Sequence, residues 1–364
     1  MRDVKYIVTV ILAAATLTSF AGNKERIGQA GANELLINPW AQSSGFGGAN
    51  SALVTGVEAF NLNISGLSGI NKTELYYSNV ILFQGSGIGI NSLALGQRVG
   101  EQGVLGISVN AMSFGNIEVT TTDNPDGGQG TFSPQFLNLS LAYARSFSNS
   151  IHGGGAIRIV SESIQDVSAQ GVALDAGIRY ITGEYDRMKF GIALRNVGPK
   201  MRYSGDGLSE VVLLQDAEFT LNQRAESFEM PALLNIGASY DFYLLPTVLE
   251  EGQELEEGQK PSDYRLTVAG TFTSNSFSQD QSRGGVELGF KQYVAVRAGL
   301  VYETSVFSGL GPAGRLTANT GPTMGLTLML PFNGKDESGM SLDYSYRFAN
   351  PLGGTHSFGL RLRI

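Results

Sequence analysis

The chain has 364 residues, of which 48 are glycine, 16% are charged and 42% are apolar, and its formal net charge is −8. It has no cysteine and only two histidines, which excludes disulfides, thiolate chemistry, cysteine-based zinc sites and a histidine-rich metal centre. The acidic balance argues against a nucleic-acid-binding protein, which normally carries a basic surface. The charged fraction is also low against the roughly 25% of soluble domains.

Residues 1–21 have the pattern of a cleaved secretory signal peptide. Arg2 and Lys5 precede an apolar run over 6–17, and the residues at 19 and 21 are small, as a cleavage site requires. A short membrane anchor is the alternative, but the run falls short of the ~20 residues that a spanning helix needs. No later apolar run approaches 18 residues, so we expect no membrane-spanning helix beyond this point.

Residues 22–71 form a segment of a different kind. It has no period-two alternation and is too apolar to extend freely into water. We therefore expect a compact segment with short helical turns that folds into the mouth of the following domain as a plug.

From residue 72 onward the hydropathy pattern has a period of two, which predicts β-strands. Over 172–180, for example, Val172, Leu174 and Ile178 share one face, while Asp175 and Arg179 share the other. About fourteen segments show this pattern: 72–84, 86–99, 103–120, 134–148, 150–166, 169–182, 187–197, 228–244, 262–275, 281–291, 293–304, 316–332, 337–349 and 353–364.

These segments predict an all-β fold, a transmembrane antiparallel β-barrel over 72–364. Most exceed the ~5–6 residues of a typical soluble strand and suit a tilted membrane strand of ~9–11 residues. One face is apolar, whereas the other has small residues and single charges, as in a crowded barrel lumen. Strands can span lipid only as a closed barrel, so we expect the outer membrane of a Gram-negative bacterium.

The connections alternate in length. Tight turns near 100–102, 148–150 and 291–293 are expected at the periplasmic end, and longer loops over 121–133, 198–227 and 305–315 at the outer end. The acidic stretch 245–262 is the exception, because it is long and falls on the periplasmic side. Either it is a true periplasmic excursion or the strand count is off by one near it.

The inner faces place charged side chains in the lumen, where we expect them to pair across strands and close the interior rather than form an open filter. These residues are Arg158, Asp175, Arg179, Arg195, Asp241, Arg265, Glu287, Arg297, Asp343, Arg347, Arg361 and Arg363.

Two outer loops are too apolar to lie freely in water, so we expect them to pack on the barrel mouth or on a partner protein. The candidate partner-binding residues are Met201, Tyr203, Leu208, Leu213, Leu214, Phe219, Val306, Phe307 and Leu310.

No enzymatic site is expected. The available bases, His152 and His356, fall near opposite barrel ends and have no Ser/Asp pair at strand spacing. The sequence predicts no catalytic residue, metal site or cofactor. Asp123 and Asp126 fit a polar turn better than a calcium loop.

The C-terminal segment matches a barrel-assembly signal of the form polar-x-Gly-x-x-apolar-x-apolar. The matching residues are Ser357, Gly359, Leu362 and Ile364. This pattern resembles the tag that outer-membrane assembly machinery reads, although it ends on Ile rather than Phe.

The plug segment resembles the PorV/PorQ family of Bacteroidota outer-membrane proteins, relatives of FadL-type fourteen-stranded barrels with an N-terminal hatch. The family pattern has Gly-Ala, Glu-Leu-Leu-Ile, a Pro, Ala-Arg-Ser, Gly-Met-Gly, and later Glu-Ala followed by Asn-Pro-Ala-Gly-Leu. The characteristic positions here are Glu34, Pro39, Trp40, Gly45, Gly47, Asn63 and Gly66. Gln42, Phe46 and the pair 64–65 depart from the pattern.

The resemblance implies a non-enzymatic role in the type IX secretion system. Such proteins bind the C-terminal signal domain of secreted cargo and shuttle it from a large outer-membrane translocon barrel to a cell-surface attachment complex. The implied partners are these proteins and outer-membrane lipid, with no nucleic acid. Two alternatives stay open: a FadL-like channel for hydrophobic small molecules, and a structural barrel that supports another complex.

Overall fold

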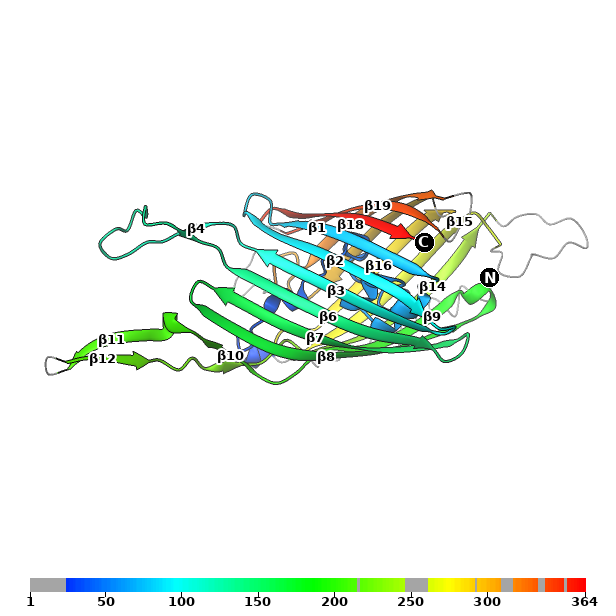
Figure 1. Ribbon diagram of the computed structural model, residues 1–364. Helices are drawn as coiled ribbons and strands as arrows, with labels where there is room; N and C mark the ends of the chain where they lie inside the picture. The colour runs from blue at the N-terminus through cyan, green and yellow to red at the C-terminus, as the bar shows by residue number, and fades with distance from the viewer. Residues whose placement is uncertain are drawn as a thin grey trace, which may run out of the picture.

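The computed structural model describes residues 24–214, 217–245, 261–291, 293–308, 317–332, 338–349 and 352–364. Fourteen antiparallel strands close into a barrel, as the sequence predicts (Figure 1). The expected signal peptide, most of the acidic stretch and Leu310 lie outside the described residues.

Each barrel strand pairs with its neighbours in the chain, and β1 pairs with β20 to close the sheet. The long excursion between β9 and β14 does not change this order, because these two strands also pair directly. The barrel strands are β1 Thr73–Leu82, β2 Ile88–Val99, β3 Gly103–Ser113, β6 Gln135–Ser146, β7 Ile151–Ile164, β8 Val167–Thr182, β9 Met188–Val197, β14 Leu233–Leu244, β15 Tyr264–Asn275, β16 Gln281–Phe290, β17 Val294–Tyr302, β18 Gly321–Pro331, β19 Gly339–Phe348 and β20 Gly354–Arg363.

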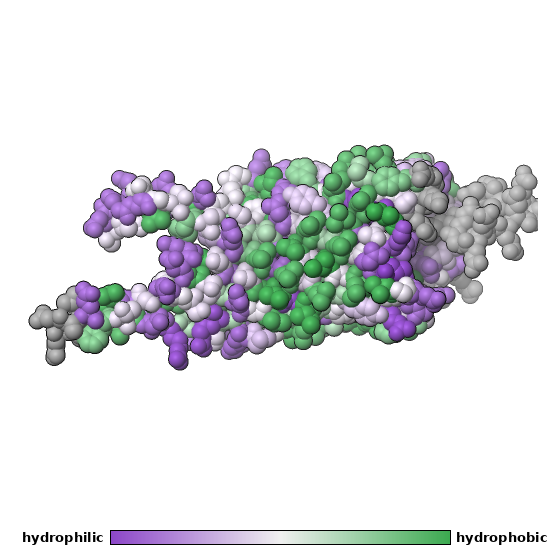
Figure 2. Space-filling model, viewed as in Figure 1, coloured by the Kyte–Doolittle hydropathy of each residue, from purple (hydrophilic) through white to green (hydrophobic). Residues whose placement is uncertain are grey.

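The alternation of side chains along each strand separates an apolar outside from a packed inside. On β8, Leu174 and Ile178 are exposed, whereas Asp175 and Arg179 are buried, so the expected faces are confirmed. The exposed apolar side chains form a broad band on the side shown in Figure 2, with hydrophilic residues beyond it. A band of this kind fits the hydrocarbon layer of a bilayer.

Several strand boundaries differ from the expected ones at the outer end. The segment 103–120 ends as a barrel strand at Ser113, and 228–244 begins as one only at Leu233. The segment 316–332 likewise joins the barrel at Gly321. Alternation continues into the outer loops, because short hairpins there also have two faces, so the pattern alone does not mark where the barrel wall stops.

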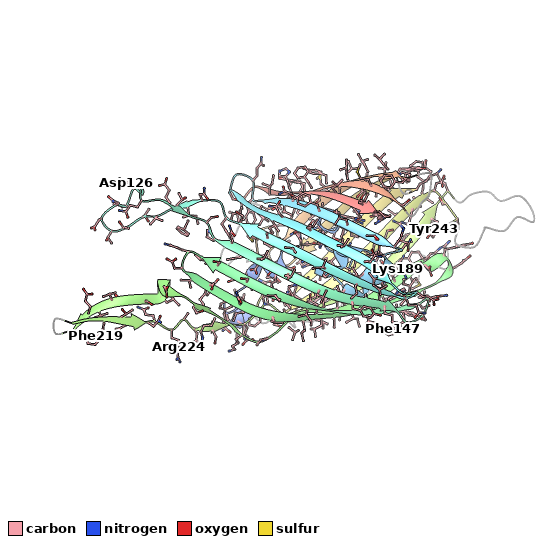
Figure 3. All side chains as sticks on the ribbon, viewed as in Figure 1. Asp126, Phe147, Lys189, Phe219, Arg224 and Tyr243 are labelled. Atoms are coloured by element: carbon pink, nitrogen blue, oxygen red, sulfur yellow. The ribbon has the colours of Figure 1, made fainter. Side chains whose placement is uncertain are left out.

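The outer loops contain short strands outside the fourteen-stranded wall: β4 Ile117–Glu118, β5 Thr131–Phe132, β10 Met201–Ser204, β11 Ser209–Leu214, β12 Ala217–Asn222 and β13 Ser227–Phe228. β4 lies within the expected strand segment 103–120, whereas β5 and β10 to β12 lie in segments that were expected as plain loop. The β11–β12 hairpin and the loop with β4 extend well beyond the barrel, at the end opposite to the C-terminus (Figure 1). Asp126 and Phe219 lie near their tips, whereas Phe147 and Tyr243 lie toward the other end (Figure 3).

The plug runs through the barrel from its outer mouth to its periplasmic end. Ala30 pairs with Glu229 beside β13 at the outer end, and Arg98 donates hydrogen bonds to the carbonyls of Ile70 and Asn71 at the other end. Its elements are the 3-10 turns Lys24–Arg26, Asn33–Leu36, Val57–Asn61 and Ile64–Gly69, and the short helix α2 Ala41–Gly45. In the described part of the chain, no helix is long and apolar enough to cross a bilayer.

Candidate functional site

The centre of the plug is held at the seam where the barrel closes. Glu58 of the plug is fully buried and forms an ion pair with Arg361 of β20, and it accepts a hydrogen bond from the Ser43 hydroxyl. Glu74 of β1 accepts a 2.9 Å hydrogen bond from the backbone N–H of Val57. The same carboxylate lies 4.0 Å from Arg361, so one charged cluster joins the plug, the first barrel strand and the closing strand.

An aromatic stack extends this contact. The ring of Trp40 is completely buried and stacks on Tyr76 of β1 at a centroid distance of 5.1 Å. Its indole N–H donates a 2.9 Å hydrogen bond to Asn61. Tyr76 in turn lies under the guanidinium of Arg361, 4.4 Å from the ring centroid, which adds a cation–π contact to the ion pair.

Several residues of the plug motif have structural roles. Gly45 is so close to Gly325 of β18 that a Cβ added to Gly45 would lie 2.7 Å from the Gly325 Cα. Asn63 accepts a hydrogen bond from the backbone N–H of Ser65 and donates one to the carbonyl of Ile178. Pro39 contributes a carbonyl that accepts a 2.6 Å hydrogen bond from Ser78. The motif therefore specifies how the plug fits the barrel.

Most lumen charges of the middle and the periplasmic end form ion pairs, several of them across strands as expected. Arg158 and Asp175 form a buried ion pair at 2.8 Å, and Glu287 binds both Arg265 at 2.7 Å and Arg297 at 2.5 Å. The other pairs are Lys189–Asp241, Arg361–Glu58, Arg361–Asp343 and Arg363–Glu74. Arg179 has no acidic partner among the residues that the structure describes, and it donates a hydrogen bond to the backbone carbonyl of Val54 in the plug. The plug thus supplies partners that strand alternation alone does not indicate.

Three arginines near the outer end differ from this pattern. Arg195 of β9, Arg283 of β16 and Arg347 of β19 form no salt bridge with any described residue, and the Nε of each is buried without an acceptor. The expectation that the lumen charges pair across strands is therefore wrong for these three, as it is for Arg179. They lie where the plug fills the lumen less completely, since Arg283 and Arg347 are partly exposed.

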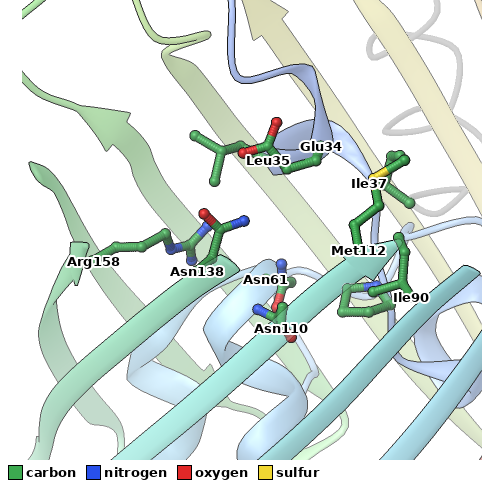
Figure 4. Close-up of a pocket in the computed structure, with 10 residues that line it drawn as sticks. Glu34, Leu35, Ile37, Asn61, Ile90, Asn110, Met112, Asn138 and Arg158 are labelled. Atoms are coloured by element: carbon green, nitrogen blue, oxygen red, sulfur yellow. The ribbon is translucent and has the colours of Figure 1, made fainter. Parts of the chain in front are cut away.

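A small pocket lies toward the outer mouth, between the plug and strands β2, β3, β6 and β7 (Figure 4). Its free volume is about 10 Å³, near the lower limit for one water molecule. Apolar and polar side chains share its lining: Glu34, Leu35, Ile37, Pro39, Asn61, Ile90, Asn110, Met112, Asn138 and Arg158.

The carboxyl group of Glu34 has an unusual environment in this pocket. Both of its oxygens are buried without a well-formed hydrogen bond. Burial and the neighbouring carboxylate of Glu162 raise the pKa of Glu34 to about 7. Glu162 accepts a hydrogen bond from Tyr203 of β10, so the plug and the outer loop meet at this pair of acids.

The candidate partner-binding residues divide into two groups. Phe219 and Phe307 are exposed, and Tyr203 and Leu208 are partly exposed. Met201 and Val306, however, are buried, at 1% and 3% exposure, so their assignment to a partner surface is wrong. Met201 packs with Leu35 and Met230 under the outer loop because a short strand, β10, folds back beside β8. The side chains of Leu213 and Leu214 lie outside the description.

The residues of the assembly signal lie on β20. Ser357 and Gly359 face the lumen, where a Cβ at Gly359 would meet the Tyr76 hydroxyl. Leu362 pairs opposite Leu75 of β1, and Ile364 is exposed at the periplasmic end. The signal thus coincides with the strand that closes the barrel, while its recognition by assembly machinery stays a prediction.

The two histidines make separate local contacts. His152 lies within 3.0 Å of the hydroxyls of Ser68 and Ser146, and His356 within 3.0 Å of the hydroxyl of Tyr344. Among the described residues no group of three or more His, Asp or Glu side chains is placed to hold a metal ion.

Comparison with solved structures identifies the fold. No protein-family model matches the chain, and no curated protein matches it in sequence. The toluene transporter TbuX of Ralstonia pickettii is similar with a TM-score of 0.52 and 12% identity, over 90% of this chain and 98% of TbuX. The toluene transporter TodX of Pseudomonas putida gives 0.51 and 13% over 89% and 96%, and the monoaromatic hydrocarbon channel CymD gives 0.51 and 13% over 90% and 98%.

These similarities show that the chain shares the fold of these channels, a closed β-barrel of fourteen antiparallel strands. At this level of identity the likeness concerns the fold. The closer resemblance to PorV/PorQ proteins, and with it the Bacteroidota origin and the type IX role, stays a proposal.

Proposed function

We propose that this protein is a FadL-like outer-membrane channel that admits hydrophobic small molecules at its outer mouth. The observation that carries the proposal is the pocket beside the plug segment Glu34–Pro39, because apolar side chains from Ile90 and Met112 of the wall meet Leu35 and Ile37 of the plug there. The similar barrels TbuX and TodX are described as toluene transporters, which supports this class of cargo.

Passage requires the plug to move. The pocket is too small for a hydrocarbon, and the buried ion pairs and the stack of Trp40 on Tyr76 fill the lumen beneath it. The described conformation is then the closed state of the channel. Movement of the plug away from the wall, from its outer end to Ser51, would enlarge the pocket without breaking the cluster around Glu58.

A disulfide lock tests this proposal, because the chain has no cysteine of its own. The hydroxyls of Ser51 in the plug and Thr271 in β15 lie 2.8 Å apart, so Ser51→Cys with Thr271→Cys is suited to form a disulfide. Uptake of radiolabelled toluene and of oleate into proteoliposomes is the readout. The oxidised double variant should lose uptake and recover it on reduction, whereas Ser51→Cys alone should transport in both conditions. Absence of uptake by the unmodified chain would contradict the proposal.

We propose as a second function the binding of secreted protein cargo in a type IX secretion system. The plug motif resembles that of PorV/PorQ proteins, and the β11–β12 hairpin carries Val211, Phe219 and Leu221 exposed far from the barrel. An isolated two-stranded hairpin is marginal in water, so apolar side chains at its tip favour a covering protein. The comparisons with solved structures do not bear on this role.

Replacement of residues 209–222 by a short Gly-Ser linker separates the two functions. Loss of surface display of secreted proteins, with toluene uptake unchanged, would favour the cargo-binding function. If surface display and toluene uptake are both unchanged, cargo binding through this hairpin is contradicted. The disulfide lock is the complementary control, because it should abolish toluene uptake and leave surface display unchanged.

A further inference from the structure

The pocket beside the plug contains several hydrogen-bond acceptors that have no donor. Both carboxylate oxygens of Glu34 are buried without a well-formed hydrogen bond, and so are the amide oxygens of Asn110 and Asn138. All three residues line the same pocket, and each of them is less than a tenth exposed. Four unpartnered acceptor atoms thus border one space of about 10 Å³.

The barrel wall places two of these acceptors side by side. Asn110 of β3 and Asn138 of β6 lie directly opposite each other in the strand register. Ser92 of β2 lies opposite Asn110 on its other side, and the buried hydroxyl of Ser92 also lacks a partner. Residues that pair directly in an antiparallel sheet point to the same face. The three side chains therefore form a polar row on the lumen side of the wall.

Apolar side chains lie next to this polar row, one step nearer the outer mouth. Ile90 of β2 is opposite Met112 of β3 in the register, and Ile37 of the plug packs in the same cluster. Glu34 and Leu35 border the pocket from the plug (Figure 4). The pocket therefore combines apolar walls with a group of acceptors.

The guanidinium of Arg158 also lines the pocket, but its donors are used elsewhere. Its Nε donates to Ser140, its Nη1 to Asn196, and its Nη2 to Asp175 and to the carbonyl of Phe60. The described residues thus supply no well-formed donor to the four acceptors. A water molecule donates only two hydrogen bonds, so the one water that the space could hold leaves acceptors unpaired.

Buried acceptors without a donor favour a ligand that brings one. An acceptor that loses water and gains no donor is unfavourable. A site built to bind an OH or NH group therefore rejects an analogue without that group more strongly than an apolar pocket rejects one with an extra methyl group. We propose that this pocket selects hydrophobic molecules that carry a hydrogen-bond donor, a hydroxyl or an ammonium group on an apolar body, over plain hydrocarbons.

This inference rests on the proposed channel function and specifies its cargo. Toluene, named for the similar barrels, has no donor. Asn110 and Asn138 belong to the wall, so movement of the plug widens the pocket and leaves both amides at its edge. Glu34 moves with the plug. A hydroxyl group needs only the amides, whereas an ammonium group also needs the carboxylate of Glu34.

Uptake of toluene, p-cresol and p-methylbenzylamine into proteoliposomes at about pH 8 tests the selection, because the three share a tolyl group and differ in the donor. The oxidised variant with Ser51→Cys and Thr271→Cys gives the background rate through lipid. Above this background, we expect p-cresol or the amine to enter about tenfold faster than toluene at equal concentration, the effect of one hydrogen bond to a buried acceptor.

Substitutions of the wall asparagines should remove the preference. Asn110→Leu and Asn138→Leu should each lower the ratio of p-cresol to toluene uptake by about threefold or more, and neither breaks a bond of the amide oxygen. The matched control is Asn91→Leu, an exposed asparagine on the outer face of β2, which should leave the ratio unchanged. Glu34→Gln should lower uptake of the amine alone. Fluorescence of Trp40, the single tryptophan, reports whether the plug is seated in each variant.

The outcomes separate this selection from the channel itself. Faster uptake of p-cresol alone would identify a neutral hydroxyl as the favoured donor, and of the amine alone an ammonium group, and either result supports the proposal. Equal rates for the three compounds, or an unchanged ratio in both wall variants, would overturn the selection and leave the channel function standing. Uptake of none of them above the background would overturn both.

Discussion

Arginine side chains have different binding partners in the outer part of the lumen from those in its middle and periplasmic parts. In the former, Arg158, Arg297 and Arg361 each bind a buried carboxylate, and Arg361 finds one in the plug itself. At the outer end, Arg283 and Arg347 have no acidic partner among the described residues. Arg179, toward the periplasmic end, also lacks an acidic partner among the described residues, but it donates to the Val54 carbonyl of the plug. Arginine therefore holds the plug at the lower levels of the barrel, whereas Arg283 and Arg347 at the outer level bind no carboxylate among the described residues.

The largest effect is expected for Arg361→Gln. It leaves Glu58 and Glu74 buried without their shared counterion, which should lower the free energy of unfolding by about 3–5 kcal/mol. Urea unfolding in detergent, followed by the mobility shift of the folded barrel on a gel, measures this. Arg363→Gln is the control, because Arg363 binds the same Glu74 but is a third exposed, so its loss should cost under ~1 kcal/mol. Equal losses would contradict the role of burial.

Gly325→Val should displace the plug by steric conflict rather than by charge. The new side chain meets the Cα of Gly45, and such overpacking typically costs about 1–3 kcal/mol. Acrylamide quenching of Trp40 should increase as the plug leaves its position. Gly284→Val on β16 is the matched control, since an added Cβ there has no neighbour within 4 Å. Similar quenching in both variants would refute the close fit of plug and wall.

Acidic conditions should stabilise the outer end of the plug. The pKa of Glu34 is about 7 in the folded protein and 4.5 in the unfolded chain, so the proton favours the folded state. This stabilisation is complete below pH 4.5 and is lost as the pH rises through about 7, by about 1–3 kcal/mol. Denaturant midpoints from Trp40 fluorescence between pH 5 and 8.5 measure it. Glu34→Gln should remove the dependence, while the exposed Glu118→Gln should keep it.

The smallest change in stability is expected for Arg347→Gln. No partner is lost with this side chain, so the unfolding free energy should change by less than ~0.5 kcal/mol or rise slightly. Urea unfolding in detergent, followed as for Arg361→Gln, measures the change. A large destabilisation would mean that Arg347 has a structural partner. The outer arginines would then not differ from the paired arginines deeper in the lumen.

The sequence predicts the barrel well because strand faces alternate strictly. The strand number, the inward direction of Arg158 and Arg361 and the long outer loops all follow from that period. The partner of Arg361 does not follow, because Glu58 precedes it by 303 residues and meets it only when the plug lies inside the closed barrel. The burial of Met201 was missed for a similar reason: its short strand folds back onto β8, and no local pattern marks that turn.

The contact between Glu58 and Arg361 also bears on how the protein assembles. The strand that carries Arg361 completes the ring of strands by joining β1, and its lumen side meets the plug at the same point. A ring that closes around an empty centre leaves the guanidinium without Glu58, and a plug that docks before closure leaves that carboxylate without Arg361. Closure of the barrel and docking of the plug thus favour each other. Assembly intermediates that have completed only one of the two steps are less stable than the finished barrel.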